Sequence, residues 1–587
     1  MKNIIKFFAI ILVFVVFSSC EDFLDSANYT TKDENSFPKT EKDANQMLVG
    51  VYAILNVSHA QGINTWLQIA ELASDDRFGG GGMNDKECQA FSHLLYINPN
   101  QFNGFWSDRY TGISRATSAI AALDLMPEGD LKNQKMGEAK FLRANWYFEL
   151  VQLLGDIPLL KELPKDVSEA QKPPAQAPQE EVFKLIATDL WDAYSTMPSE
   201  NYNQYISGTV TKWAAGAMLA RVYLFYTGFY KKSDLPTETG SVTEQQVIAA
   251  LNDIIANSGH DLLSDFRTLW PYSNSATKKD YEFVKDAPTW LEGSQNKEVI
   301  FAIKMNSLGD WGTTVGYSNS NCLFFGIRSE NTDYKDCFPI GQGWGFGPVN
   351  SKLWDAWPAD DPRRAASIWN QANPDEEAGA YKWGSDTQME ETGMWQKKII
   401  ATTAYGKGDD KKGLWQSFWS DPAYGDRQGD DMQLGHGSDL IIIRFADVLL
   451  MHAELTKTVT GINKVRTRAN ASKTPAGTLP MIGAYSLEAL QDERHWELAF
   501  EGLRWGDIRR WGIAAEMLDR IYGAPIRNIG NQTSMKPQKA GLKTRYEQTN
   551  GFFNKPQDQI TLAGDETLLK QNPGWTGEGI SYDGWVD

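Results

Sequence analysis

Residues 136–160 read MGEAKFLRANWYFELVQLLGDIPLL, and their apolar side chains recur with a helical period. The positions that share this spacing of about 3.6 residues are Phe141, Ala144 or Trp146, Phe148, Val151 and Leu154. Gly155 follows the last of them, and Pro158 comes soon after. Glycine favours the end of a helix, and proline interrupts one. The stretch therefore predicts a helix that ends at Gly155.

Similar segments lie on both sides of this helix. Stripes of apolar residues begin at Ala44 and at Trp106, and two further helical patterns follow a proline-rich connector, at residues 181–197 and 211–228. The second of these carries alanine and glycine where helices must approach closely. The alternation predicts stacked antiparallel helix pairs of the tetratricopeptide type, with degenerate repeats, because the full 34-residue consensus does not recur.

The helical period stops at about residue 270. Residues 271–435 are rich in Gly, Asn, Asp, Trp and Tyr, which predicts an irregular lobe, because the segment is too long for a simple loop. Helical patterns return in residues 436–587, first in SDLIIIRFADVLLMHAELTK from Ser438. We therefore expect an all-α, mainly helical fold with an N-terminal helical region over 41–270, the irregular lobe over 271–435, and C-terminal helices with a turn-rich tail.

The N-terminus has the layout of a lipoprotein signal. Two lysines, an apolar run that ends at Phe17, and Ser18 and Ser19 precede CEDFLD at residues 20–25. We interpret residues 1–19 as the signal peptide, Cys20 as the lipidated residue, and residues 20–40 as a polar tether. An ordinary signal followed by a free cysteine is the alternative.

Charge and cysteine content exclude several classes of protein. The net charge is −18 and the pI is near 5.0, which argues against binding to a nucleic-acid backbone. After Cys20 only Cys88, Cys322 and Cys337 remain, without a CxxC pattern, so neither a zinc knuckle nor a disulfide framework is encoded. Pairing of Cys322 with Cys337 is left open, as is a structural calcium ion.

No pattern in the chain indicates catalysis. The HxE spacings at His452 and His495 lack the further residues of a known zinc site, and GGGG at 79–82 has no lysine to reach a phosphate, which makes it a flexible turn. A glycoside hydrolase needs two carboxyls at a fixed separation, and nothing local selects a pair among 75 acidic residues. We expect no catalytic residue and no cofactor, and we assign no residue as a metal ligand.

Several stretches together resemble the SusD/RagB family of outer-membrane nutrient-binding lipoproteins. They are CEDFLD, FLRANWYFELVQLLGDIPLL, DPRR at 361–364, IIIRFADVLLMHAEL, INKVRTRAN and ERHWELAFEGLRWGDIRRWG at 493–512. The resemblance implies four tetratricopeptide-like helix pairs and an irregular lobe that carries the ligand site. It also implies a non-enzymatic protein that is lipid-anchored in the outer membrane, faces the cell exterior, and acts as a lid over a TonB-dependent transporter of the SusC type.

The charged residues of the 493–512 stretch are interpreted as structural. Glu493, Arg494, Glu497 and Glu501 lie at helical spacing from Arg504, Arg509 and Arg510, which predicts ion pairs within the stretch itself. Its apolar residues can be buried beside them. We therefore do not expect this stretch to bind the ligand.

Two other segments fit the chemistry of sugar recognition, in which aromatic faces stack on pyranose rings and planar polar groups bind hydroxyls. The first is ELASDDRFGGGGMND, and the second is MNSLGDWGTTVGYSNSNCLFFG with the following GQGWGFG. The candidate ligand-binding residues are Asp75, Asp76, Arg77, Phe78, Trp311, Tyr317, Asn319, Asn321 and Trp344. Internal salt bridges at Asp75 and Arg77, and burial of Trp311 and Trp344 under the lobe, are the alternatives.

The aromatic content favours a glycan as the ligand. The chain has 21 Trp, 22 Tyr and 27 Phe, and several lie in Gly- and Asn-rich stretches that packing alone does not explain. The sequence thus predicts a binding protein that captures an oligosaccharide or polysaccharide and delivers it to its transporter. Capture of a peptide or glycopeptide is the alternative, and a glycoside hydrolase or a helical scaffold for protein partners fits less well.

Overall fold

The fold comes from a computed structural model of the chain. The structure describes residues 38, 40–170, 175–306, 318–328, 337–373, 376, 381–383, 388–405, 414–415, 435–472, 477–565 and 567–587. The signal peptide, Cys20, Trp311 and Tyr317 lie outside the described residues. Within the described part, no helix has the length and apolarity needed to cross a membrane.

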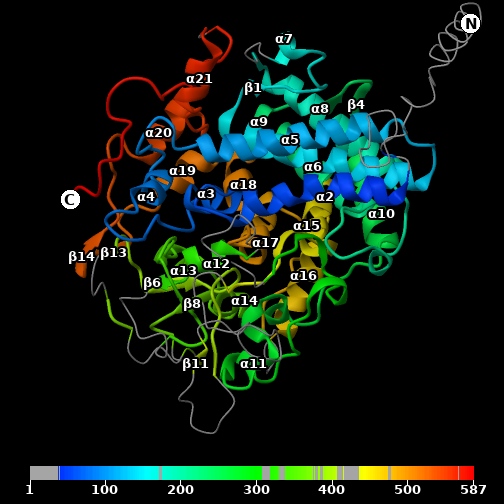
Figure 1. Cartoon of the computed structure of the whole chain (residues 1–587). Helices are drawn as coiled ribbons and strands as arrows, with labels where there is room; N and C mark the ends of the chain where they lie inside the picture. The colour runs from blue at the N-terminus through cyan, green and yellow to red at the C-terminus, as the bar shows by residue number, and fades with distance from the viewer. Residues whose placement is uncertain are drawn as a thin grey trace, which may run out of the picture.

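The first half of the chain is a stack of helices. Its long members are α2 (Glu41–Ala60), α5 (Asn103–Leu123), α6 (Asp130–Leu154), α8 (Gln179–Thr196), α9 (Lys212–Tyr230) and α10 (Glu244–Asn257). Its short elements are α3 (Trp66–Leu72), α4 (Lys86–Ser92), α7 (Val167–Ala170), β1 (Ile157–Pro158), β2 (Gln176–Ala177), β3 (Leu235–Thr237) and β4 (Gly240–Val242). Each long helix packs on the next, as the blue and cyan ribbons of Figure 1 show.

Local sequence sets the ends of these helices. The Thr211 side chain accepts a hydrogen bond from Ala214 N at the start of α9, and Thr243 forms a capping box at the start of α10. Helix α6 ends where the sequence predicts, at Gly155, whose φ is +70°. Phe148 on this helix is buried between Phe183 and Phe225, at 6.2 and 5.8 Å between ring centroids. The prediction of a mainly helical fold is confirmed.

A lobe of short elements follows α10. Its helices are α11 (Ser275–Lys278), α12 (Ser320–Phe324), α13 (Ser351–Ala356) and α14 (Pro362–Ser367). Its strands are β5 (Val299–Ile303), β6 (Ile327–Arg328), β7 (Gln342–Gly343), β8 (Ile368–Asn370), β9 (Met394–Gln396), β10 (Ala404–Tyr405), β11 (Leu414–Trp415) and β12 (Leu440–Arg444). In the described part every sheet has two strands, and β12 pairs antiparallel with β5 across the whole lobe sequence.

The helical stack then continues on the far side of the lobe. Helix α15 (Phe445–Thr456) packs against α10, although the lobe separates the two helices in sequence. The elements that follow are α16 (Thr460–Ala471), α17 (Leu487–Leu498), α18 (Arg504–Arg510), α19 (Ala514–Asp519), β13 (Pro525–Asn528), β14 (Asn531–Ser534), α20 (Leu542–Thr549) and α21 (Gln557–Ala563). Helices α15 to α18 lie between the N-terminal helices and the green lobe in Figure 1. The lobe is thus inserted into one continuous stack. The boundaries that the sequence predicts at 270 and 435 stay a prediction.

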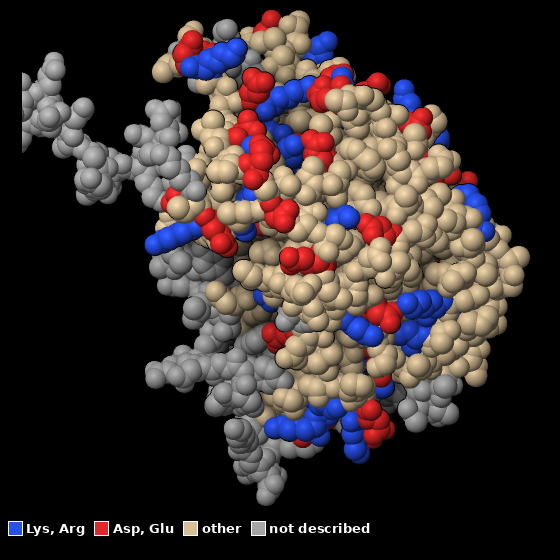
Figure 2. Space-filling model, turned by 90° about the vertical axis from the view of Figure 1, so that its right-hand side faces the viewer, with Lys and Arg blue, Asp and Glu red and all other residues tan. Residues whose placement is uncertain are grey.

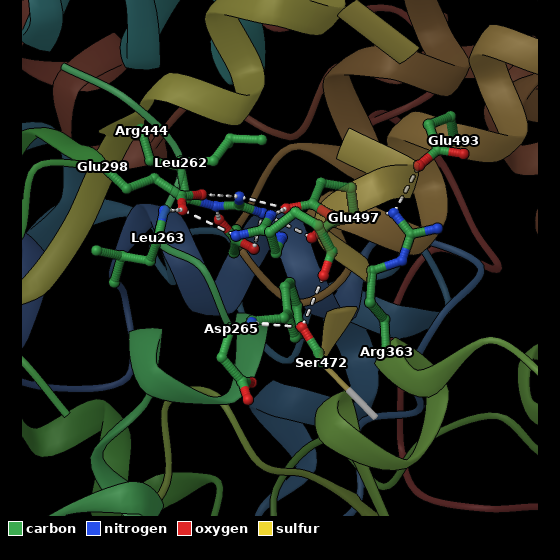
Figure 3. Close-up of polar contacts among 12 residues, drawn as sticks. Leu262, Leu263, Asp265, Glu298, Arg363, Arg444, Ser472, Glu493 and Glu497 are labelled. Atoms are coloured by element: carbon green, nitrogen blue, oxygen red, sulfur yellow. Dashed lines mark hydrogen bonds and ion pairs between the residues drawn. The ribbon is translucent and has the colours of Figure 1, made fainter. Parts of the chain in front are cut away.

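A buried network of ion pairs joins the lobe to these C-terminal helices. Its centre is Glu497 on α17, whose carboxylate contacts Arg363 of α14 at 3.0 Å and Arg444 at the end of β12 at 2.6 Å. Arg468 of α16 also pairs with Glu497 and reaches Glu298 at 2.8 Å. Figure 3 shows Glu298, Arg444, Glu497, Arg363 and Glu493 from these separate elements pointing toward one another. We call this set, with Arg468, the ion network.

The ion pairs of the 493–512 stretch differ from one expectation. Its charges were expected to pair within the stretch at helical spacing, whereas most of their partners come from other segments. Arg494 pairs with Asp447 at 2.7 Å, Arg504 with Asp75 at 2.7 Å, and Arg510 with Glu454 at 2.5 Å. The role in holding the fold is as expected, but the contacts tie distant parts of the chain together.

The three described cysteines, Cys88, Cys322 and Cys337, are buried and form no disulfide. The pairing of Cys322 with Cys337 that the sequence left open is therefore not present.

On the face shown in Figure 2, blue and red side chains are interspersed among broad tan areas, and outside the grey atoms no large basic patch gathers there.

We expect Glu497→Gln to destabilise the protein strongly. Although burial by itself raises the pKa of Glu497, the guanidinium groups of Arg468, Arg444 and Arg363 hold that pKa well below its usual range. The amide leaves buried guanidinium groups without their counter-charge, at a cost of about 3–5 kcal/mol at pH 7. A carboxyl group whose pKa is lowered by folding stabilises the fold fully only at a pH above its pKa in the unfolded chain. The cost of the substitution should therefore shrink as the pH falls below about 4.

Urea unfolding at pH 7 and pH 3 measures both effects. The matched control is Glu516→Gln, since the Glu516 side chain is 70% exposed and its ion pair with Arg520 spans 3.9 Å. This variant should change the unfolding free energy by less than about 0.5 kcal/mol. Equal stability of the two variants at pH 7 would show that the ion network does not hold the lobe.

Candidate functional site

The fold brings the two sequence-predicted segments together. Phe78 N donates to Pro348 O at 3.0 Å, the Arg77 guanidinium donates to Gly347 O at 2.8 Å, and Gly81 N donates to Gly345 O at 2.7 Å. Isolated antiparallel bridges join Arg77 to Val349 and Gly80 to Phe346. The turn after α3 therefore lies directly against the segment that carries Trp344.

Glycine is required where these segments touch. A Cβ atom on Gly79 would lie 2.3 Å from Gln89 Cα, and one on Gly80 would lie 2.3 Å from Pro348 Cδ, with φ at +67°. Residues 79–82 are all buried. The glycine turn, as we call residues 79–82, is therefore tightly packed, and the expectation of a flexible turn is wrong.

Residues 75–78, just before the glycine turn, hold the turn in position, and we call them its frame. Asp75 pairs with Arg504 at 2.7 Å, and the Asp76 carboxylate lies 2.6 Å from His495 Nε2. The Arg77 guanidinium lies over the Phe325 ring at 3.8 Å, and Phe78 is completely buried. These contacts correspond to the salt-bridge alternative that the sequence left open, and they leave these side chains little surface for a ligand.

A further pair of buried charges supports this frame. Glu71 Oε2 lies 3.6 Å from Arg77 Nη1 in the protein interior. Burial raises the pKa of Glu71 to about 7 and lowers the pKa of Arg77 to about 10. The same Glu71 carboxylate accepts a hydrogen bond from Gly502 N at 2.8 Å, which connects the frame to the C-terminal helices.

The two predicted asparagines also have internal contacts. Asn319 caps α12 by accepting from Asn321 N at 3.2 Å, and it donates to Ser438 O at 3.1 Å. Asn321 is fully buried and donates to His59 O at 2.8 Å. The Asn321 side chain therefore joins α12 to α2, and the Asn319 side chain joins α12 to the segment just before β12. The ligand role predicted for Trp311 and Tyr317 stays a prediction, because both residues lie outside the described part of the chain.

Trp344 is the predicted residue that lies at an accessible position. Its half-buried ring packs on Phe324 and Phe346, with centroids at 5.1 and 6.0 Å. Arg328 Nη1 donates to Trp344 O at 3.2 Å and lies 3.4 Å from Asp85 Oδ2, and both of these side chains are partly exposed. A tryptophan with a partly exposed ring therefore contacts a guanidinium through its backbone carbonyl, and that guanidinium lies beside a carboxylate; sugar recognition requires groups of these kinds.

An open groove lies on the other side of the glycine turn. Met389 N donates to Gly81 O at 2.8 Å, and the Glu390 backbone is tied to Asn528 in the β13–β14 hairpin. The groove, which we call the hairpin groove, is lined by Met83, Asn84, Met389, Asn528, Asn531, Gln532 and Trp585, among others. The indole of Trp585 is held by a 3.0 Å hydrogen bond to Asp587.

Sequence reasoning did not identify the hairpin groove. The only signal was an aromatic residue in a turn-rich tail, DGWVD at 583–587, of the kind that marked Trp311 and Trp344. The other walls of the groove come from the β13–β14 hairpin, whose sequence has no distinguishing pattern. In the part of the chain that the structure describes, no three His, Cys, Asp or Glu side chains gather in a way that could hold a metal ion. The accessible groups suit binding by stacking and hydrogen bonding.

Comparisons with known proteins agree with this architecture. A model described as the SusD family matches residues 342–575, and one described as starch-binding, associating with the outer membrane, matches residues 22–224. "SusD-like protein P25" of Formosa agariphila is 24% identical over 91% of this chain and 94% of its own length. A "SusD-like protein" of Bacteroides ovatus is 23% identical over 80% of this chain and 78% of its own length.

Solved structures share the fold over nearly the whole chain. A "laminarin binding SusD-like protein" has 26% identity and a TM-score of 0.68, covering 92% of this chain and 100% of its own. Surface glycan-binding protein A from Bacteroides thetaiotaomicron, solved in complex with laminarihexaose, has 18% identity and a TM-score of 0.64, covering 91% of this chain and 99% of its own.

We expect Gly80→Ala to disrupt the site by separating its two segments. The control is Gly62→Ala, because Gly62 has a similar φ of +79° but open space around its Cβ position. Both variants carry backbone strain, so the difference between them isolates the close contact with Pro348. Gly80→Ala should lower the free energy of unfolding by about 1–3 kcal/mol more than the control, measured by urea unfolding. Equal losses would mean that the turn adapts to the added methyl group.

Proposed function

Since the chain belongs to the SusD family, we propose that it captures a glycan at the cell surface and delivers it to a transporter of the SusC type. The observation that carries the proposal is the grouping of Trp344, Arg328 and Asp85 beside the glycine turn, which we call the glycine-turn site. The protein binds and releases its ligand, and no bond in the glycan is broken.

The physical basis of capture is a preformed aromatic face. The C–H groups of a pyranose ring stack on an indole with little loss of conformational freedom, because Phe324 and Phe346 already hold the Trp344 ring. Arg328 and Asp85 provide a donor fork and an acceptor for vicinal hydroxyls. The hairpin groove, lined by Met83 and Asn84 just after the glycine turn, offers a second surface, which suits a chain of sugars better than a single unit.

Laminarin is the first polysaccharide to test. The solved relative with 26% identity over nearly the whole chain is described as laminarin-binding, and this similarity supports a glucan as the ligand class. Peptides form the competing class, because an extended chain with aromatic side chains also fits an open groove.

Delivery requires the protein to remain at the membrane. We propose that residues 1–19 are removed as a signal peptide and that lipid on Cys20 anchors the mature chain in the outer membrane, facing outward. The description of the matching model for residues 22–224, which mentions association with the outer membrane, supports this location. Residues 20–40 would then tether the folded body to the lipid.

Trp344→Ala should weaken laminarin binding while the fold stays intact. Loss of one aromatic platform costs about 1–3 kcal/mol on the scale measured for stacked nucleic-acid bases, which is roughly tenfold or more in affinity. Affinity gel electrophoresis and thermal unfolding measure the two effects separately. The matched control is Trp191→Ala, a half-buried tryptophan on α8 in the helical stack.

Two outcomes would contradict the assignment of the site. Unchanged laminarin binding by Trp344→Ala, with binding lost in Trp311→Ala, would place the aromatic platform on Trp311. Retention of a mixed peptide library by the wild type, with no retention by any polysaccharide, would favour the peptide alternative.

Cys20→Ala should release the protein from the membrane. The thioether that carries the lipid cannot form without the Cys20 sulfur, so palmitate labelling should disappear and the protein should move to the soluble fraction. Ser19→Ala is the control, because it keeps a small residue before the cysteine. Labelling that persists in Cys20→Ala would refute the anchor.

A further inference from the structure

A second pocket lies on the seam between the helical stack and the lobe. One wall is the turn before α9, at residues 202–211, and the other is the lobe segment 290–302, with the start of β12 between them. This pocket, which we call the seam cleft, is partly open to solvent, and the centre of a water molecule can occupy about 80 Å³ of it. It shares no lining residue with the hairpin groove, Asp85, Arg328 or Trp344.

Two buried polar atoms of the seam cleft have no hydrogen-bond partner. The Trp270 side chain is 2% exposed, and its Nε1–H donor is unmatched. His260 is 6% exposed, and its Nδ1 lies 2.9 Å from Lys297 O. Because a carbonyl only accepts, Nδ1 carries the proton, and His260 Nε2 is left as an unmatched acceptor. Burial also lowers the pKa of His260 to about 4, so the ring is neutral near pH 7.

Aromatic rings stand beside these unmatched atoms. Tyr202 stacks on His260 with ring centroids 4.7 Å apart, and the Tyr205 hydroxyl donates to Pro198 O at 2.5 Å. Both tyrosines and Trp290 are half-buried lining residues. The tyrosine rings are therefore held in position before any ligand arrives, which lowers the entropic cost of stacking.

The charges of the seam cleft favour a neutral ligand. Lys398 donates to Glu501 at 2.6 Å, and Lys304 pairs with Asp439, so these carboxylates already have counter-charges. Glu292 lies at the mouth, where burial and then the charge of Asp439 raise its pKa to about 7. An anion would meet Glu292 and Asp439, and a cation would compete with lysines that are already in place.

We propose that the seam cleft is a second binding pocket, separate from the glycine-turn site, for one or two units of a neutral sugar. A hydroxyl both donates and accepts, so neighbouring hydroxyls satisfy an indole N–H and an imidazole lone pair together. The tyrosine rings bind the C–H face of the same unit.

The test measures binding of small neutral sugars to the purified full-length protein by saturation-transfer NMR. Glucose, galactose, mannose, xylose and laminaribiose are the probes, with glucuronate and trialanine as charged and peptide comparisons. Trp344→Ala serves as the background, because it weakens the glycine-turn site. At least one neutral sugar should still bind to this variant, whatever becomes of laminarin binding.

Two substitutions then examine the seam cleft itself. Trp270→Phe keeps a ring and deletes the unmatched donor, and it should weaken sugar binding at least fivefold. Trp357→Phe is the matched control, because Trp357 is equally buried, also has an unmatched Nε1, and lies outside the seam cleft. Tyr205→Ala, at the half-exposed rim, should weaken binding without affecting the core, and so serves if Trp270→Phe does not fold.

The proposal is overturned if no neutral sugar binds to Trp344→Ala, or if glucuronate or trialanine binds more tightly than every neutral sugar. It is also overturned if Tyr205→Ala and a folded Trp270→Phe bind as well as Trp357→Phe. A failure of laminarin binding in the wild type bears only on the glycine-turn site, so the two sites are judged independently.

Discussion

The carboxylate of Glu497, surrounded by three guanidinium groups in the protein interior, is the constraint on which the rest of the structure depends. Its partners come from α14, β12 and α16, while Glu497 itself lies on α17. Desolvated charges are costly unless every one is matched, so these four elements have one arrangement in which the interior is neutral. The described helices and strands of the lobe are all short, and the ion network attaches the lobe to the helical stack.

The same principle explains why many polar side chains do not face a ligand. Asp75, Asp76 and Arg77 have the chemistry of a sugar site, but their partners Arg504, His495 and Glu71 lie in the interior. Burying these pairs fixes the turn that follows them. In the proposed function, the polar residues before the glycine turn act only indirectly, because they position the segment beside Trp344, Arg328 and Asp85.

The two proposed binding surfaces lie where the helical stack and the lobe meet. The glycine turn allows two backbone segments to approach more closely than any side chain permits, and Arg328 and Asp85 pair beside the backbone of Trp344 on the second segment. The seam cleft lies at another part of the same boundary, where the turn before α9 faces the lobe. A scaffold that holds an irregular lobe at several points can thus present separate surfaces to solvent without enlarging its core.

The sequence alone determined the helical segments, because the period of apolar residues and the glycine after Leu154 act locally. Its motifs also predicted the family correctly, and its aromatic content indicated a class of ligand. Only the tertiary structure decided which polar residues are buried and which lie at the surface. Glu497 pairs with Arg363 across 134 residues, and Arg77 meets Gly347 across 270. The hairpin groove likewise joins Met83 to Trp585. Spacing along the chain does not specify such partners, since burial and pairing of charge depend on contacts that exist only after the lobe has docked on the helices.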